Sequence, residues 1–139
     1  MRKVLVGLSF CIGCAGNNVE GIVVLDTDVE DTFGPEIQHS PITEPQVYGQ
    51  DIWLEANAVD AQSSVWLMMI VFQPETANEW SDMPLSEVGG GLFQGKINGG
   101  DVRSGGMRYF LRAIDELGNE ACLPVDCEVN PWHFAVVPN

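Results

Sequence analysis

Residues 35–139 consist of short β-prone runs separated by clusters of glycine, proline and asparagine, and this alternation limits the fold more than any other feature. No segment carries the long apolar period of an amphipathic helix, and the only helix predicted is one turn near residues 84–88. Residues 51–60 alternate between a row that starts at Ile52 and a row that starts at Trp53, as in a half-buried strand. Runs at this spacing predict an all-β protein, an antiparallel β-sandwich of about seven strands. The predicted strands are 36–39, 51–60, 64–72, 79–83, 92–97, 107–115 and 132–137.

Residues 109–119 carry a recognisable motif within the run 107–115 and the turn after it. They read Tyr-Phe-Leu-Arg-Ala-Ile-Asp-Glu-Leu-Gly-Asn, which resembles the Tyr-Tyr-x-x-Ala-x-Asp-x-x-Gly-Asn signature of bacterial immunoglobulin-like and fibronectin-III-like domains. Segments 49–56 and 70–74 resemble the second and third strands of these domains. The resemblance covers about residues 36–138 and implies an immunoglobulin-like antiparallel β-sandwich. The antibody-type Cys-Trp-Cys pattern is absent.

The resemblance also implies which side chains face the core. Asp115 and Asn119 are expected at a tight turn, where their side chains bond nearby backbone amides and need no functional explanation. The residues expected inside are Ile52, Leu54, Ala56, Trp66, Met68, Ile70, Phe72, Tyr109, Leu111, Ala113, Phe134 and Val136.

The residues that alternate with these core residues are expected to face outward. On the strands 64–72, 107–115 and 132–137 these outward-facing residues are largely apolar. An apolar patch of several hundred Å² on a monomer usually marks an interface, so we expect contact with another protein here. The alternative is that the apolar segment 21–25 folds back and covers this face. The candidate interface residues are Val65, Leu67, Met69, Val71, Arg108, Phe110, Arg112 and His133.

The first residues read as an export signal. Two cations precede a short apolar run that ends in Ile12-Gly13-Cys14, and this order resembles a bacterial lipoprotein signal, in which the peptidase cuts before a cysteine that is then acylated. The alternatives are an ordinary secretory signal cut near Ala15 and a buried first strand of a cytoplasmic protein. The apolar run is too short for a transmembrane helix, which needs about 20 residues.

This interpretation divides the chain into a signal peptide at 1–13, an acidic tether at 14–35 and the sandwich at 36–138. The protein is then exported and anchored through the lipid on Cys14, in the outer membrane or at the cell surface. Export also favours a disulfide between Cys122 and Cys127, because such bonds persist outside the cytoplasm. Half of a zinc site is the alternative, but zinc needs about four ligands.

Charge narrows the class of partner. Six Lys and Arg residues against 20 Asp and Glu residues give a formal net charge of −14 at pH 7. So acidic a protein repels nucleic acid and anionic lipid headgroups. The negative charge is compatible with cationic partners and with divalent ions, including calcium held by Asp60, Asp115 or Asp126.

The remaining residues give little indication of catalysis. His39 and His133 lie on separate predicted strands, and no serine or cysteine has the setting of a nucleophile. We therefore expect a non-catalytic envelope protein without a cofactor, used in adhesion, scaffolding or assembly, with a small hydrolase as the third hypothesis. The second is a carbohydrate-binding module, because exposed aromatic rings stack on sugars, and Trp53 and Trp80 are the candidates.

Overall fold

The structure is a computed structural model that describes the backbone of residues 2–12 and 19–139, with side chains from Glu30 onward. The chain divides into two units, Met1–Thr32 and Phe33–Asn139, and each is described by itself. The described residues contain no helix with the length and hydropathy that a membrane span requires.

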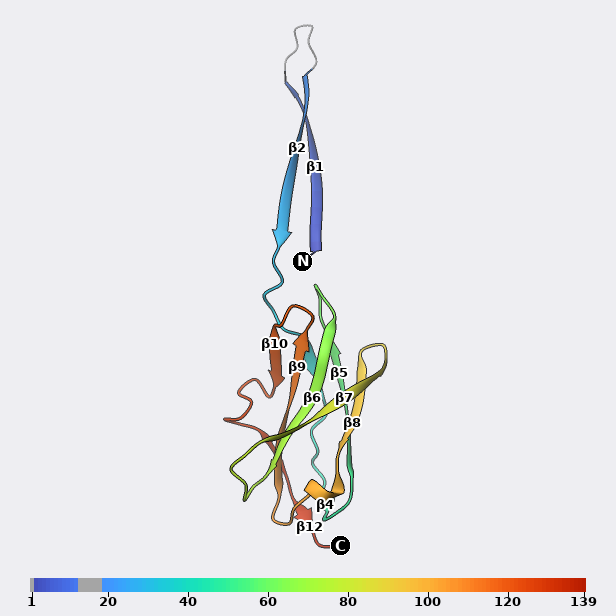
Figure 1. Cartoon of the computed structure of the whole chain (residues 1–139), viewed down its shortest axis with the longest axis vertical. Helices are drawn as coiled ribbons and strands as arrows, with labels where there is room; N and C mark the ends of the chain where they lie inside the picture. Colours follow the sequence, from blue (N-terminus) through green and yellow to red (C-terminus); the bar gives the residue numbers. More distant parts are fainter. Residues whose placement is uncertain (1, 13–18) are drawn as a thin grey trace. The chain divides into compact units, whose positions relative to one another are not determined.

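The N-terminal unit is a β-hairpin (Figure 1). Strand β1 (Arg2–Ile12) pairs antiparallel with β2 (Val19–Val29) along its whole length, from Arg2 opposite Val29 to Ile12 opposite Val19. β1 thus lies within the predicted signal peptide, and β2 lies within the predicted tether. Because removal of residues 1–13 would take away the strand that pairs with β2, the hairpin belongs to the uncleaved chain. Cys14 lies outside the described residues.

The C-terminal unit is built from strands, as the short β-prone runs predict, with one 3₁₀ turn. Its elements are β3 (Glu36–Gln38), β4 (Gln46–Val47), β5 (Ile52–Val59), β6 (Val65–Pro74), β7 (Ser81–Gly89), β8 (Leu92–Ile97), η1 (Gly99–Asp101), β9 (Met107–Asp115), β10 (Glu120–Leu123), β11 (Trp132–Phe134) and β12 (Val136–Val137).

The strands follow one another in the order β10-β9-β6-β7-β8-β5-β3 with antiparallel pairing, and β11 pairs with β9. β7 pairs with β6 through residues 81–85 and with β8 through residues 86–89, so it joins the two layers (Figure 1). The all-β antiparallel sandwich is therefore confirmed. Its connectivity is compatible with an immunoglobulin-like fold.

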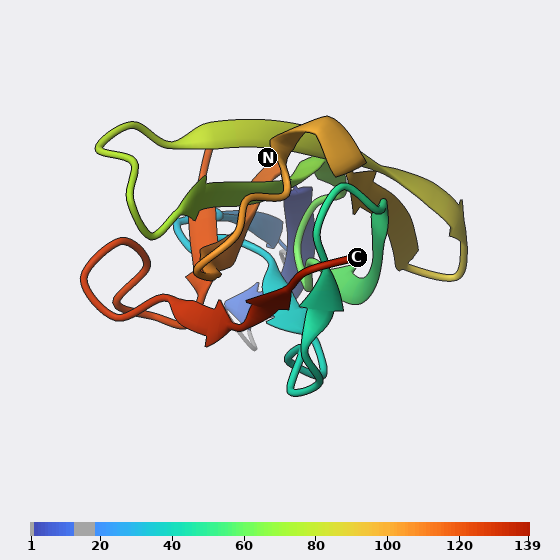
Figure 2. The ribbon, with the colours of Figure 1, turned by 90° about the horizontal axis from the view of Figure 1, so that it is seen from below.

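A parallel pair completes the sandwich near the C-terminus. β12 runs parallel to β4, with Val136 opposite Gln46, and the two strands lie side by side when the domain is viewed from below (Figure 2). The predicted last strand at 132–137 is thus two short strands with different partners, since β11 pairs with β9.

Two local predictions are corrected. The helical turn expected near residues 84–88 is part of β7, because hydrogen bonding to both β6 and β8 keeps this segment extended. β10 was not predicted; it pairs with the end of β9, where Glu120 lies opposite Ile114. The chain also passes close to β10 at Gly34, where a Cβ atom would overlap the backbone of Glu120.

The core contains the predicted residues with one exception. β5 alternates strictly between buried and exposed residues, and Tyr109, Met68, Ile70 and Leu111 are fully buried. Trp66, expected inside, is 68% exposed. A β-bulge between Val65 and Leu67 explains the difference, because the extra residue reverses the facing of the strand.

Candidate functional site

The outer face of β6 and β9 is the surface that the sequence singled out as an interface. Leu67 lies opposite Ile114, Met69 opposite Arg112, and Val71 opposite Phe110. These pairs form one continuous row of side chains. The row divides into a closed half and an open half.

The closed half is covered by the connection between β6 and β7. Phe110 is 4% exposed, and the ring of Trp80 packs edge-on against it with ring centroids 5.1 Å apart. The guanidinium group of Arg108 lies over the ring of Trp80, with its Cζ atom 5.5 Å from the ring centroid. The same group donates a hydrogen bond to the backbone carbonyl of Ala77. Val71 is buried beside Phe110.

The structure contradicts the predicted exposure of four residues: Val71, Phe110 and Trp80 in the closed half of the face, and Val65 at the bulge. Val71 and Phe110 are not available to a partner, because Trp80 covers Phe110 and both side chains are buried. Trp80 is half-buried and acts as a plug, so it does not present a free ring to a sugar. Val65 packs against the core instead of facing outward, which follows from the bulge at Trp66.

The open half lies at the bulge. Trp66 is 68% exposed and Leu117 is 47% exposed, while Leu67, Met69 and Ile114 are half-buried. A hollow of about 470 Å³ lies among Trp66, Ile114 and Leu117. Trp66, Leu67, Met69, Ile114 and Leu117 are together called the Trp66 patch below.

Arg112 and His133, two further members of the predicted interface, have acidic partners within the sandwich. Arg112 forms an ion pair with Glu120 on the neighbouring β10. The Nδ1 atom of His133 lies 3.1 Å from Oε1 of Glu75. Both side chains are therefore paired with carboxylate groups of the sandwich.

The predicted cysteine pair lies beside this face. Cys122 and Cys127 are at disulfide distance, with Cα atoms 5.9 Å apart. A hollow of about 690 Å³ lies between their loop and the side chains of Phe110 and Arg112. Val125, at the tip of the loop, is 83% exposed.

Trp53 lies on the other layer of the sandwich, on the outer face of β5. It is 70% exposed, and the exposed side chains of Glu55 and Asn57 follow it on the same face. Trp53 thus faces outward as predicted. The two exposed tryptophans have different surroundings, since Trp66 has apolar neighbours and Trp53 has polar ones.

The two histidines contact different partners. His39 is half-buried; its Nδ1 atom lies 2.6 Å from the carbonyl oxygen of Glu55, and its Nε2 atom lies 3.0 Å from the hydroxyl of Tyr109. Burial lowers the pKa of His39, with a smaller opposing effect from the hydrogen bond to Glu55. Burial also raises the pKa of Tyr109 to about 12. This network links the segment after β3 to β5 and β9, whereas the side chain of His133 pairs with Glu75.

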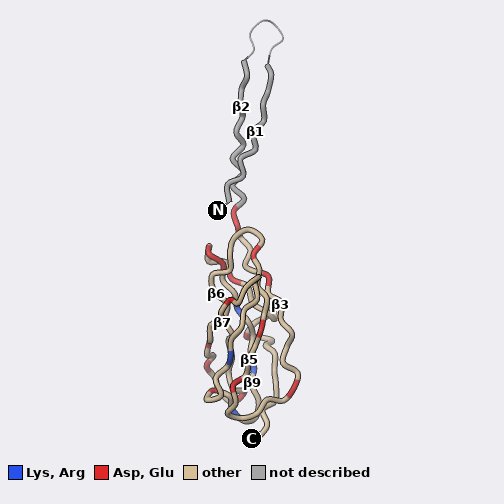
Figure 3. The backbone as a smooth tube through the Cα atoms, turned by 90° about the vertical axis from the view of Figure 1, so that its right-hand side faces the viewer, with Lys and Arg blue, Asp and Glu red and all other residues tan. Residues whose placement is uncertain are grey.

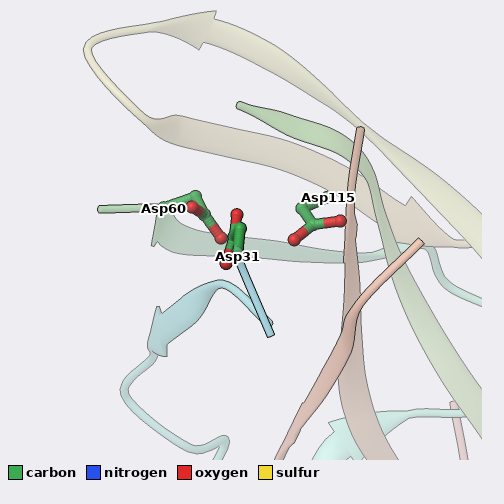
Figure 4. Close-up of side chains that lie close together, drawn as sticks. All are labelled: Asp31, Asp60 and Asp115. Atoms are coloured by element: carbon green, nitrogen blue, oxygen red, sulfur yellow. The ribbon is translucent and has the colours of Figure 1, made fainter. Parts of the chain in front are cut away.

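Two of the loop carboxylates considered for calcium lie close together within the sandwich. Asp60 and Asp115 bring one carboxylate oxygen each to within 4.8 Å (Figure 4). Asp31, also labelled there, belongs to the N-terminal unit. Asp126 lies in the Cys122–Cys127 loop and is not part of this pair.

Both carboxylates already accept hydrogen bonds from their own loops. Asp60 accepts from the backbone amides of Gln62 and Ser63. Asp115 accepts from the backbone amides of Leu117 and Asn119 and from the Asn119 side chain, as the resemblance implies. Burial raises the pKa of Asp115, but these hydrogen bonds outweigh it and leave the pKa lowered. The pair thus has a structural role as two turn-forming residues.

Acidic residues occur at many places along the sandwich, and Lys or Arg residues at few (Figure 3). Two surfaces of the described sandwich carry an exposed tryptophan: the Trp66 patch, and the outer face of β5 with Trp53, Glu55 and Asn57, which is called the Trp53 face below. No protein-family model matches the chain, and no match is found among curated proteins.

Proposed function

We propose that this chain is an exported, lipid-anchored protein of the cell envelope whose sandwich makes non-catalytic contact with another protein. The contact would serve adhesion, scaffolding or assembly. The observation that carries the proposal is the Trp66 patch, in which Trp66 and Leu117 are exposed beside Leu67, Met69 and Ile114. Aromatic side chains of this kind dominate protein interfaces, because they bury a large area in a few residues.

The surroundings of the patch favour a particular kind of partner. Asp115 and Glu116 line the same hollow as Trp66, and the whole chain carries a net charge of −14. A complementary protein surface would present an apolar centre with a positively charged rim. An acidic partner or a nucleic acid would be repelled.

Photo-crosslinking from the patch tests the contact directly. A photoreactive amino acid at position 66 of the full chain, expressed in its native cells, is expected to trap one specific protein that mass spectrometry identifies. The same reagent at position 53 is the matched control, since both tryptophans are about equally exposed. Trp66→Asp and Leu67→Asp should each abolish the complex while the unfolding midpoint stays unchanged. A complex of unaltered size in both variants would rule the contact out.

The anchor is tested at Cys14. Cys14→Ala is expected to move the protein from the membrane fraction to the soluble fraction, because a lipid on this residue would be the only covalent anchor proposed. Cys11→Ala is the matched control, since it removes the neighbouring thiol and leaves Cys14 in place. The anchor proposal fails if Cys14→Ala stays in the membrane fraction, or if mass spectrometry finds an unmodified Cys14 in the mature protein.

A further inference from the structure

The outer face of β5 carries an aromatic ring at one end and polar side chains beyond it. Trp53, Glu55 and Asn57 occupy alternate positions and face outward, while the residues between them are buried. This face belongs to the layer opposite the Trp66 patch. Whatever binds here therefore uses other residues than the proposed protein contact.

Neighbouring strands extend this polar row on both sides. Gln94 on β8 lies opposite Glu55 and donates a hydrogen bond to its carboxylate. Gln38 on β3 lies opposite Asn57. The face thus offers both donors and acceptors, because amides supply both and the carboxylate accepts.

The Trp53 ring is fixed in place without being covered. Lys96 lies opposite it on β8, with its Nζ atom 5.5 Å from the ring centroid, and the same atom is held 2.6 Å from a carboxylate oxygen of Asp51. Because 70% of Trp53 remains exposed, most of the indole stays open to a ligand. An ordered, open aromatic ring costs little conformational entropy when something stacks on it.

A hollow of about 560 Å³ lies beside the ring. Its polar lining includes Gln38, Ser40, Glu55 and Asn57, and Trp53 forms one wall. This volume lies within the range of small-molecule sites. Because several polar side chains line the hollow, a hydrocarbon or a protein's apolar segment is disfavoured as the occupant.

We propose that the Trp53 face binds a neutral pyranose sugar, as a unit of an uncharged oligosaccharide or polysaccharide. A pyranose has an apolar C–H face that stacks on the indole, and hydroxyl groups at its edge that both donate and accept. Asn57 and Gln38 would pair with these hydroxyls, and Glu55 would accept from them. Glu55 and the net charge of −14 disfavour phosphorylated, sulfated and uronic-acid ligands through electrostatic repulsion.

The test uses the purified full chain and an array of neutral and anionic oligosaccharides, followed by calorimetry with the strongest neutral ligand. At least one neutral oligosaccharide is expected to bind. Trp53→Ala should weaken that binding at least about tenfold, the size expected for loss of a stacked ring. Trp66→Ala should bind like the unaltered chain, which separates this site from the proposed protein contact.

Two further variants keep the test decisive if Trp53→Ala fails to fold. Trp53→Phe keeps a stacking ring and should retain binding within a few fold. Asn57→Ala, at an exposed position, should weaken binding several fold while the unfolding midpoint stays the same. The proposal is overturned if only anionic ligands bind, if none bind, or if Trp66→Ala and Trp53→Ala weaken binding equally.

Discussion

The hydroxyl of Tyr109 lies 3.0 Å from Nε2 of His39, and this contact joins β9 to the segment that follows β3. The same hydroxyl accepts a hydrogen bond of 2.9 Å from the backbone amide of Ile42. Nδ1 of His39 lies 2.6 Å from the carbonyl oxygen of Glu55, so Nδ1 carries the proton and donates, and Nε2 accepts from Tyr109. All partners are satisfied only while His39 is neutral.

Removal of the Tyr109 hydroxyl should therefore cost more than one ordinary hydrogen bond. Tyr109→Phe keeps the buried ring but leaves the His39 ring nitrogen and the Ile42 amide without their partner. We expect the free energy of unfolding to fall by about 1 to 3 kcal/mol, the cost of an unsatisfied buried polar group. Urea denaturation of the full chain measures this loss.

Tyr48→Phe is the matched control for Tyr109→Phe. Tyr48 is 42% exposed, and its hydroxyl makes no such buried network among the described residues. Its variant should stay within about 0.5 kcal/mol of the unaltered chain. Equal losses in the two variants would contradict the role assigned to the Tyr109 hydroxyl.

The lowered pKa of His39 makes stability depend on pH. The unfolded chain takes up a proton near pH 6.5, whereas in the folded chain burial moves this uptake to lower pH. Between these two values the unfolded state binds more protons, so the free energy of unfolding decreases as pH falls from about 7 toward 5. Because His39 takes up a single proton, the slope of the unfolding free energy against pH is at most about 1.4 kcal/mol per pH unit. Partial exposure of His39 keeps the slope well below this limit.

Denaturation at several pH values checks this dependence. His39→Asn should be less stable at pH 7 and should flatten the slope between pH 7 and 5, because the titrating ring is gone. His133→Asn, which removes the exposed histidine beside Glu75, is measured alongside as the matched control. An unchanged slope in His39→Asn would show that other groups cause it.

The strands that the sequence predicted best are those with a polar row opposite an apolar row. On β5, the polar residues Glu55 and Asn57 mark the exposed face, so Trp53 could be placed on the surface from its position alone. On β6, the residues from 65 to 72 are apolar on both faces, and such a run contains no sign of which side is buried. The bulge at Trp66 could therefore not be predicted from the sequence.

Burial of Phe110 depends on a contact that no local pattern records. Trp80 reaches it only because the connection between β6 and β7 folds back over the outer face. The sequence identified the apolar composition of this face but not the segment that closes half of it. Because the bulge turns Trp66 outward and Trp80 covers Phe110, the Trp66 patch is the part of this face that remains exposed.

Truncation of Phe110 and of Trp66 should separate a core residue from a surface residue. Phe110→Ala is expected to lower the free energy of unfolding by about 3 to 5 kcal/mol, since it removes a buried ring and leaves a cavity beside Trp80. Trp66→Ala should change it by less than about 0.5 kcal/mol, because the ring is 68% exposed. Similar losses in the two variants would mean that the Trp66 patch is buried.

Two adjacent glycines in the 3₁₀ turn provide a matched pair for backbone packing. A methyl group at Gly99 would overlap the backbone carbonyl of Gly49, whereas one at Gly100 would meet no heavy atom within 4 Å. The Gly99 amide also donates to a carboxylate oxygen of Asp51 at 2.8 Å, so the turn cannot move away without losing this bond. We expect Gly99→Ala to lower the free energy of unfolding by about 1 to 3 kcal/mol through overpacking.

Gly100→Ala should have the opposite sign or none. The backbone of Gly100 does not require a positive φ, so alanine fits there and reduces the freedom of the unfolded chain, which stabilises by about 0.4 to 1 kcal/mol. Urea denaturation of the two variants side by side gives the comparison. If both glycines tolerate alanine equally, then η1 and the β4–β5 turn do not pack as closely as the Gly99–Gly49 contact requires.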